Sequence, residues 1–185
     1  MDGEATVAPG ARQWLEQAAR EGAPPEEALA LFDSLPPVSL EAMIGNWRGG
    51  GVPTGHALDG LLEAYGWHGK RFASPDDVDP LVFTAGRGRT VALDPRYLPV
   101  GLVYKLRPHR WGWTAALFAL ASRLIRTRQP TARLRLIEHG GVTSAAMIYD
   151  RQPIIDHFRE VEPGLLLGLM DLRGMPPFFF TLRRE

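Results

Sequence analysis

The chain has 185 residues, of which 45% are hydrophobic and 23% charged, and its 21 basic residues balance its 21 acidic ones. A chain of zero net charge has no general attraction for nucleic acid, so we expect no nucleic-acid partner. The absence of cysteine excludes disulfides, thiolate catalysis and cysteine-bound metals. Because the first residues lack the pattern of a secretory signal, we predict a cytoplasmic protein, and its oligomeric state stays open.

The first predicted unit is an N-terminal helical arm, residues 1–38. Trp14 and Ala18 recur at helical spacing. At residues 24–27 two prolines precede two glutamates, an order that suits the first turn of a second helix. The consecutive prolines at 36–37 then end the arm. We expect a pair of helices that packs on, or plugs, the unit that follows.

Residues 39–98 form the second predicted unit, the first part of a β-structure. It contains a G-x-W-x-G motif at residues 45–49 and further turn-forming glycines. A short helix is expected near residues 58–65, where leucines and a tyrosine recur at helical spacing. The apolar runs at 81–84 and 90–93, joined by a glycine-rich loop, predict a β-hairpin.

Residues 99–130 are predicted to form a basic and apolar helical insert. Its helix, residues 111–126, is apolar around most of its circumference, which is more than an ordinary surface helix needs. We expect the insert either to cover the β-structure as a lid or to lie on an anionic membrane surface. The residues assigned to this lid or membrane role are Trp111, Trp113, Leu117, Leu120, Arg123 and Arg126.

Residues 131–185 are expected to complete the fold as an antiparallel meander. Five β-like segments are separated by short turns, most of which contain glycine, and short strands at this spacing favour a barrel. The predicted fold class is therefore α+β: an antiparallel, lipocalin-like β-barrel with N-terminal helices and a helical insert covering it.

Several motifs resemble one bacterial family. They are Gly45-Asn46-Trp47-Arg48-Gly49, Trp67-His68-Gly69-Lys70 with Asp79-Pro80-Leu81, Ser144 to Asp150 with Pro153 to Asp156, Leu167 to Asp171, and Phe178-Phe179-Phe180. Over roughly residues 39–184 the chain resembles GXWXG-domain proteins that carry a C-terminal domain of unknown function. This resemblance implies no particular catalytic or binding residues. A looser resemblance, to lipocalins and fatty-acid-binding proteins, implies a barrel whose first strand begins with G-x-W and whose last strand brings an arginine near the tryptophan.

An arginine near the end of the chain is expected to meet Trp47. Arg183 or Arg184 would lie on the indole face, where a cation contributes ~0.5–2 kcal/mol. Two interpretations stay open at this point: the contact closes the barrel, or it also touches a ligand.

Small side chains in the segment 142–150 raise the question of whether the barrel is hollow. Thr143, Ala145, Met147 and Tyr149 share one face of this strand, and the space beside them is either filled by neighbours or forms a cavity. We predict non-catalytic binding of a hydrophobic or amphipathic small molecule, such as a lipid whose acidic head meets an arginine. The predicted ligand-binding residues are Trp47, Arg133, Arg135, Ala145, Met147, Tyr149, Phe179, Thr181 and Arg183.

An enzyme that acts on a small apolar substrate is the alternative. Its acid–base groups would come from Asp150, His157 and Tyr149, which strand pairing could bring together. Asp156 and His157 alternate on a regular strand, so they cannot act jointly. The five histidines show no metal-binding spacing, and we predict neither a metal nor a cofactor.

Overall fold

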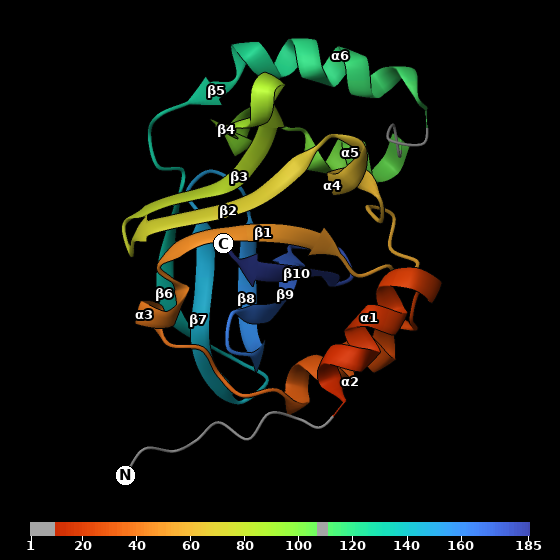
Figure 1. Cartoon of the computed structure of the whole chain (residues 1–185), viewed down its shortest axis with the longest axis vertical. Helices are drawn as coiled ribbons and strands as arrows, with labels where there is room; N and C mark the ends of the chain where they lie inside the picture. The colour runs from red at the N-terminus through yellow and green to blue at the C-terminus, as the bar shows by residue number, and fades with distance from the viewer. Residues whose placement is uncertain (1–9, 107–110) are drawn as a thin grey trace.

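The computed structural model describes residues 10–106 and 111–185, and within them eight strands close into an antiparallel β-barrel (Figure 1). The strands follow one another around the ring in chain order, so the barrel is an up-and-down meander. Their bounds are β1 Gly45–Gly51, β2 Trp67–Ser74, β3 Asp77–Ala85, β6 Ala132–His139, β7 Val142–Tyr149, β8 Ile154–Glu162, β9 Leu165–Leu172 and β10 Phe178–Arg184. The predicted α+β barrel is confirmed.

Pairing between the first and last strands closes this ring. β1 and β10 are antiparallel, in a register that sets Trp47 opposite Arg184. Where β3 meets β6, a single pair of residues, Val78 and Ala132, is in register. The ladder is short at that position because the chain leaves the ring between these two strands.

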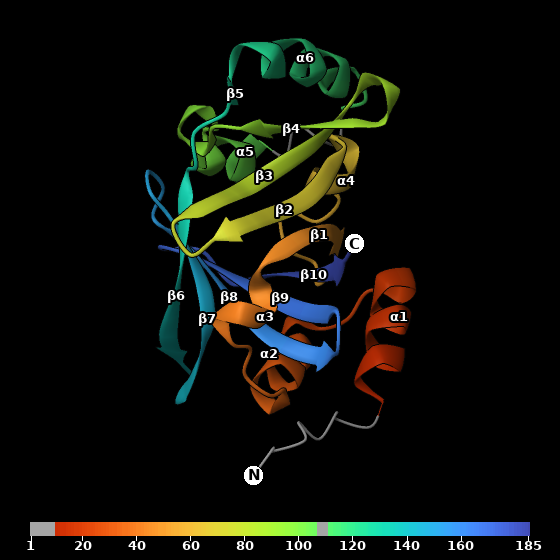
Figure 2. The same cartoon turned by 60° about the vertical axis from the view of Figure 1, so that its left-hand side comes forward.

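The helical insert occupies this excursion and lies at one end of the barrel (Figures 1 and 2). Two short strands form an arm outside the ring, in which β4 pairs with β3 and β5 pairs with β4. The elements of the insert are η1 Gly86–Gly88, β4 Arg89–Leu93, η2 Pro95–Tyr97, α5 Val100–Leu106, α6 Trp113–Ala121, η4 Ser122–Leu124 and β5 Arg126–Thr127. The hairpin expected from the apolar runs at 81–84 and 90–93 is therefore present, whereas the α-helix expected over 111–126 ends at Ala121.

A further short helix, α4 Leu61–Ala64, lies between β1 and β2. It is shorter than the helix expected over 58–65, because Gly60 adopts a φ of +77° and the helix begins after it.

The N-terminal helices cover the outer wall of the barrel rather than plugging it. α1 Ala11–Glu21 and α2 Pro25–Ser34 pack beside β8, β9 and β10 (Figure 2). Leu15 and Phe32 join Leu167 and Phe179 in an apolar cluster of their own, separate from the barrel interior. β9 and β10 are consequently buried on both faces, which explains why their sequences read as almost continuous apolar runs.

Part of the barrel interior is solid. Met43, which ends α3 Leu40–Met43, and Phe72 and Phe158 from opposite walls are all fully buried. The Phe72 and Phe158 rings meet edge to face with 5.9 Å between centroids. The remainder of the interior encloses a cavity, so the two interpretations left open by the sequence each hold for one part of the barrel.

The G-x-W-x-G motif is explained by three side chains that crowd β1. Trp47 is buried and donates its indole N–H to the carbonyl of Met43 at 2.7 Å. The guanidinium of Arg184 lies 4.4 Å from the Trp47 ring centroid and also donates to the carbonyls of Ala42 and Ile44. The predicted arginine–tryptophan contact is therefore present and is made by Arg184.

The two glycines of the motif leave room for these neighbours. Gly45 has a φ of +137°, and a Cβ added to it would lie 2.7 Å from a guanidinium nitrogen of Arg184. A Cβ added to Gly49 would overlap the six-membered ring of Trp67, which lies directly on the strand. Gly49 is required by close packing against the Trp67 ring, and Gly45 is favoured by its backbone conformation.

We expect Gly49→Ala to destabilise the barrel by about 3 kcal/mol, because the Trp67 ring must leave its place on β1. Gly50→Ala is the matched control on the same strand. Its Cβ would lie 3.0 Å from the Thr181 hydroxyl, which can move, so we expect a loss below about 1 kcal/mol. Chemical denaturation of both variants measures the difference, and equal losses would contradict this account of the motif.

Candidate functional site

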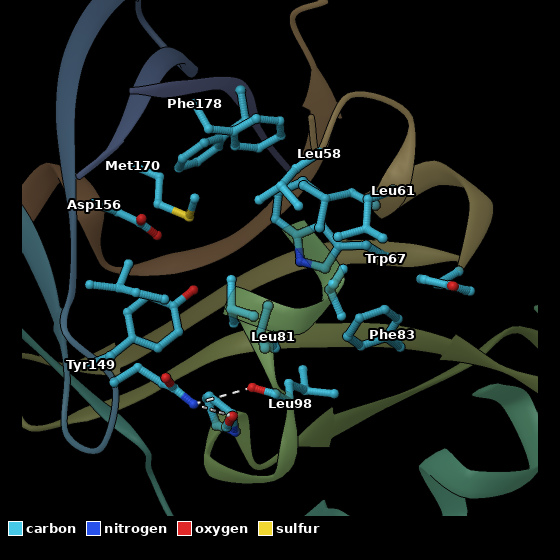
Figure 3. A pocket seen from close by; sticks show the side chains of 18 of the residues that line it. Leu58, Leu61, Trp67, Leu81, Phe83, Leu98, Tyr149, Asp156, Met170 and Phe178 are labelled. Carbon is cyan, nitrogen blue, oxygen red and sulfur yellow. Dashed lines mark hydrogen bonds between the residues drawn. The ribbon is translucent and has the colours of Figure 1, made fainter. Parts of the chain in front are cut away.

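The cavity of about 230 Å³ lies at the end of the barrel that the insert covers (Figure 3). Strands β2, β3, β7, β8, β9 and β10 supply its walls, and α4, α5 and α6 supply its cover. Most of its lining is apolar, including Leu58, Leu61, Trp67, Leu81, Phe83 and Met170. A concave apolar site with few polar groups is the usual form of a small-molecule pocket.

The inner side of α6 is part of this pocket. The Phe118 ring lies 4.7 Å from the Tyr65 ring and 5.3 Å from the Phe83 ring, measured between centroids. The Tyr65 hydroxyl also donates to the hydroxyl of Thr114 at 3.2 Å. These contacts attach the helix to β3 and to the end of α4, so α6 covers the pocket as a lid.

A second fastening holds the loop between β4 and α5. The side-chain amide of Gln152 donates to the carbonyls of Pro95 at 2.8 Å and Leu98 at 3.4 Å (Figure 3). Gln152, Pro95 and Leu98 all line the cavity. The insert is thus tied to the barrel by polar contacts at the rim as well as by aromatic packing.

The polar group of the pocket is a buried ion pair. Lys70 Nζ lies 2.8 Å from Asp156 Oδ2, with the two side chains 3% and 1% exposed. Lys70 also donates to the carbonyl of Pro80 at 3.2 Å, and its ammonium lies 5.0 Å from the ring centroid of Phe180. β2 and β8 stand four places apart in the ring of eight strands, so this ion pair crosses the barrel interior.

A bulge in β2 explains why a lysine points inward here. A regular strand would place Trp67 and Lys70 on opposite faces. The register with β3 shifts between Trp67 and Gly69 and again before Arg71, and Gly69 adopts a φ of +154°. The extra residue turns Lys70 to the same face as Trp67, and both line the pocket.

Burial raises the pKa of both acidic groups at this site. It raises the pKa of the Asp156 carboxyl, an effect that the neighbouring Lys70 ammonium opposes. Burial, together with the negative charge of Asp156, raises the pKa of the Tyr149 phenol well above its usual value. Tyr149 therefore presents a neutral hydroxyl to the cavity.

Of the predicted ligand-binding residues, Tyr149 lines the cavity. Ala145 and Met147 share its inward face, as the alternation of β7 predicts, but they lie with Trp47 in the solid part of the interior. The pocket described here does not include these three residues, so a binding role for them stays a prediction.

The other predicted ligand-binding residues lie outside the barrel interior. Phe179 packs under the N-terminal helices, and Thr181 and Arg183 follow it on the same face of β10. Both faces of β10 carry large apolar residues, so the sequence pattern could not show which face points into the barrel. Arg133 and Arg135 are also on the outer surface, where they pair with Asp150 and Asp76 at 2.8 and 2.6 Å.

The predicted acid–base groups are not brought together. Asp150 pairs with Arg133 at the end of β7, whereas His157 packs its ring on His139 with 4.2 Å between centroids. Burial, aided by His139, lowers the pKa of His157 to about 4, so this imidazole is neutral at physiological pH. Asp156 and His157 do point to opposite faces, and Asp156, which was not among the predicted site residues, faces the cavity.

The outer side of α6 is exposed. Trp111, Trp113, Leu117 and Leu120 are between 49% and 65% accessible, and the two indole rings stack with 6.3 Å between centroids. Arg123 and Arg126 follow on the exposed side of the next segment. The residues assigned to a lid or membrane role thus form an outer face, while Phe118 makes the contact with the pocket.

Within residues 10–106 and 111–185, no three histidine, aspartate or glutamate side chains are grouped so that they could hold a metal ion. The helices of the same ranges are too short or too polar to cross a bilayer.

Fold and pocket together define a small β-barrel protein with an apolar cavity under a helical lid. Residues 30–88 match the family model described as GXWXG protein, and residues 130–184 match a domain of unknown function, DUF4334. A solved structure described as a protein from Thermomonospora curvata is 34% identical, covers 95% of this chain and 98% of its own, and superposes with a TM-score of 0.69. The chain belongs to the GXWXG proteins that carry this C-terminal domain, as its motifs indicated. No curated protein matches the chain.

We expect Lys70→Met to destabilise the protein by about 3–5 kcal/mol, because it leaves the Asp156 carboxylate buried without a partner. The double variant Lys70→Met/Asp156→Leu should recover most of this loss, since it replaces the whole pair by apolar groups. Arg133→Met, which breaks an exposed pair, is the control and should cost less than about 1 kcal/mol. Denaturant unfolding of the three variants measures these differences, and a double variant no more stable than the single one would contradict the assignment.

Proposed function

We propose that this protein binds a small, largely hydrophobic molecule non-covalently in the cavity of the barrel. The observation that carries the proposal is an apolar cavity inside the barrel with one buried ion pair in its wall. Apolar walls stabilise a ligand by ~25 cal/mol for each Å² of apolar surface buried. A buried polar group contributes little to stability but can fix the orientation of a ligand.

The size of the cavity favours a compact ligand. Its volume of about 230 Å³ is below the ~300–1,000 Å³ of sites for drug-sized molecules. The arginines expected to meet an acidic lipid head lie on the outer surface or outer strand face instead. Both observations favour a small amphipathic molecule over a long-chain fatty acid.

Naphthalene is a suitable probe of the cavity, and we expect the full chain to bind one molecule saturably in isothermal titration calorimetry. Leu81→Trp should weaken this binding at least about tenfold, because the indole fills part of the cavity. Leu136→Trp is the matched control, since Leu136 lies on β6 and is 55% exposed. Absence of binding, or equal affinities for the two variants, would count against the proposed site.

Catalysis on a small apolar substrate is the second candidate function. It is favoured by the buried Asp156 carboxyl of raised pKa and the neutral Tyr149 phenol, which meet at the cavity. Groups with shifted pKa in a pocket are candidates for acid–base roles. Mass spectrometry of a co-purifying ligand separates the two candidates, because a carrier returns its ligand unchanged.

We also propose that the outer face of α6 contacts an anionic membrane surface. Trp113, Leu117, Leu120 and Leu124 supply an exposed apolar area, and no acidic residue occurs between Pro95 and Leu136. Tryptophan and arginine around an apolar face suit the interface of an anionic bilayer. A lid that lies on the membrane would open towards the bilayer, from which an apolar ligand could enter the cavity.

Vesicles that contain phosphatidylserine should therefore bind the protein more tightly than vesicles of phosphatidylcholine alone. Leu117→Ser/Leu120→Ser should weaken binding at least about a hundredfold, whereas Leu136→Ser should leave it unchanged. Flotation or sedimentation assays measure the bound fraction. If the wild type is instead a dimer that the double variant makes monomeric, the face belongs to a second copy and the membrane proposal fails.

A further inference from the structure

Two buried polar atoms at the cavity lack hydrogen-bond partners. Among the described residues, neither Oδ1 of Asp156 nor the indole N–H of Trp67 has a partner. Both residues line the cavity and are at most 9% exposed. Buried polar atoms are nearly always paired in folded proteins, because an unpaired one loses its bonds to water without replacement.

The surrounding groups do not satisfy these two atoms. Lys70 bonds to the other carboxylate oxygen of Asp156 and to the carbonyl of Pro80. The Tyr149 hydroxyl lies close enough to the carboxylate to lower the pKa of Asp156 as a hydrogen-bond donor, but it makes no hydrogen bond of normal geometry to Oδ1. Beside the hydroxyl of Tyr149, the mostly apolar cavity therefore presents an unpaired acceptor, Oδ1 of Asp156, and an unpaired donor, the indole N–H of Trp67.

We propose that the ligand is a neutral molecule with a hydroxyl group, which donates to Oδ1 of Asp156, and that a ligand oxygen accepts from the indole N–H of Trp67. This assignment rests on the proposed binding function and adds the chemical class of the ligand. A hydroxyl group can both donate and accept, so it matches the two free atoms. A hydrocarbon matches neither, and an ether matches the donor alone.

Charge at the cavity argues against an acid. Lys70 and Asp156 are the charged residues of the pocket lining, and they already compensate one another. A carboxylate ligand would bring a second negative charge close to Asp156 in a medium of low dielectric constant. It also has no hydrogen to give to Oδ1. An alcohol or phenol enters without either cost.

Four probes that share one ring system test this assignment: naphthalene, 2-methoxynaphthalene, 2-naphthol and 2-naphthoate. In calorimetry on the full chain we expect 2-naphthol to bind at least about tenfold more tightly than 2-methoxynaphthalene, because a bond to a carboxylate is stronger than one between neutral groups. 2-Naphthoate should bind most weakly of the four.

Two variants assign the effect to the named atoms. Trp67→Phe keeps an aromatic ring but removes the N–H and part of the pocket wall, so naphthalene binding reports the lost packing, and the affinity for the two oxygen-bearing neutral probes should fall about fivefold further than the affinity for naphthalene. Trp113→Phe, the same change on the exposed helix face, is the matched control. Lys70→Met/Asp156→Leu should bind naphthalene but lose the preference for 2-naphthol.

The outcomes separate this assignment from the binding function on which it rests. The assignment is wrong if the wild type binds naphthalene or 2-methoxynaphthalene as tightly as it binds 2-naphthol. The binding pocket would still stand in that case, and bound water would be the partner of the two atoms. Tightest binding of 2-naphthoate would overturn it in favour of an acidic ligand. If none of the four probes binds, the proposed function fails together with the assignment.

Discussion

The pairing of β1 with β10 is the constraint on which the rest of this structure depends. It turns an open meander into a closed ring and so creates an interior. The motif residues on β1 serve this closure: Trp47 fills the space behind it and takes the Arg184 guanidinium on its face, while the small residue at 49 admits the Trp67 ring. Because Trp67 also lines the cavity, the family motif shapes the pocket from outside it.

A charged pair inside an apolar barrel contributes little net stability, because the loss of hydration offsets the attraction between the charges. Apolar residues of the same volume would often stabilise a core at least as well as Lys70 and Asp156 do. The ammonium is held by the aspartate, a backbone carbonyl and three aromatic faces, those of Trp67, Tyr149 and Phe180. The carboxylate, by contrast, keeps one oxygen free. The proposed contact with a ligand rests on this asymmetry between the two charged groups.

Much of the fold was predictable from the sequence because its strands and turns are locally encoded. Turn glycines separated the C-terminal strands, and the paired prolines marked the end of the N-terminal arm. The residues that share the inward face of β7, Ala145, Met147 and Tyr149, were predictable from the two-residue period of a regular strand. The inward face of β10 was not predictable, because the helices that cover its outer face are remote in sequence and make Phe179 as buried as its neighbours.

The pocket was harder to predict than the fold. Lys70 faces inward through a bulge, and regular alternation gives the wrong face for such a residue. Asp156 lies on β8, opposite β2 in the ring, so nothing local in the chain couples the two residues. Gly69, two residues after Trp67, was a usable signal, since a glycine inside a strand often marks a bulge. The lid was predicted as a segment, but the inward direction of Phe118 depends on its contacts with Tyr65 and Phe83.

Two adjacent residues of α6 face different surroundings, and this couples the outer side of the helix to the cavity. Phe118 touches the cavity while Leu117 faces solvent, on one short rigid element. Any partner that displaces the helix by holding its outer side must also alter the cavity wall. Linkage then makes the effect mutual: the factor by which the partner changes affinity for a ligand equals the factor by which that ligand changes affinity for the partner. A ligand in the cavity and a partner on the outer face of α6 would thus each change the affinity of the protein for the other.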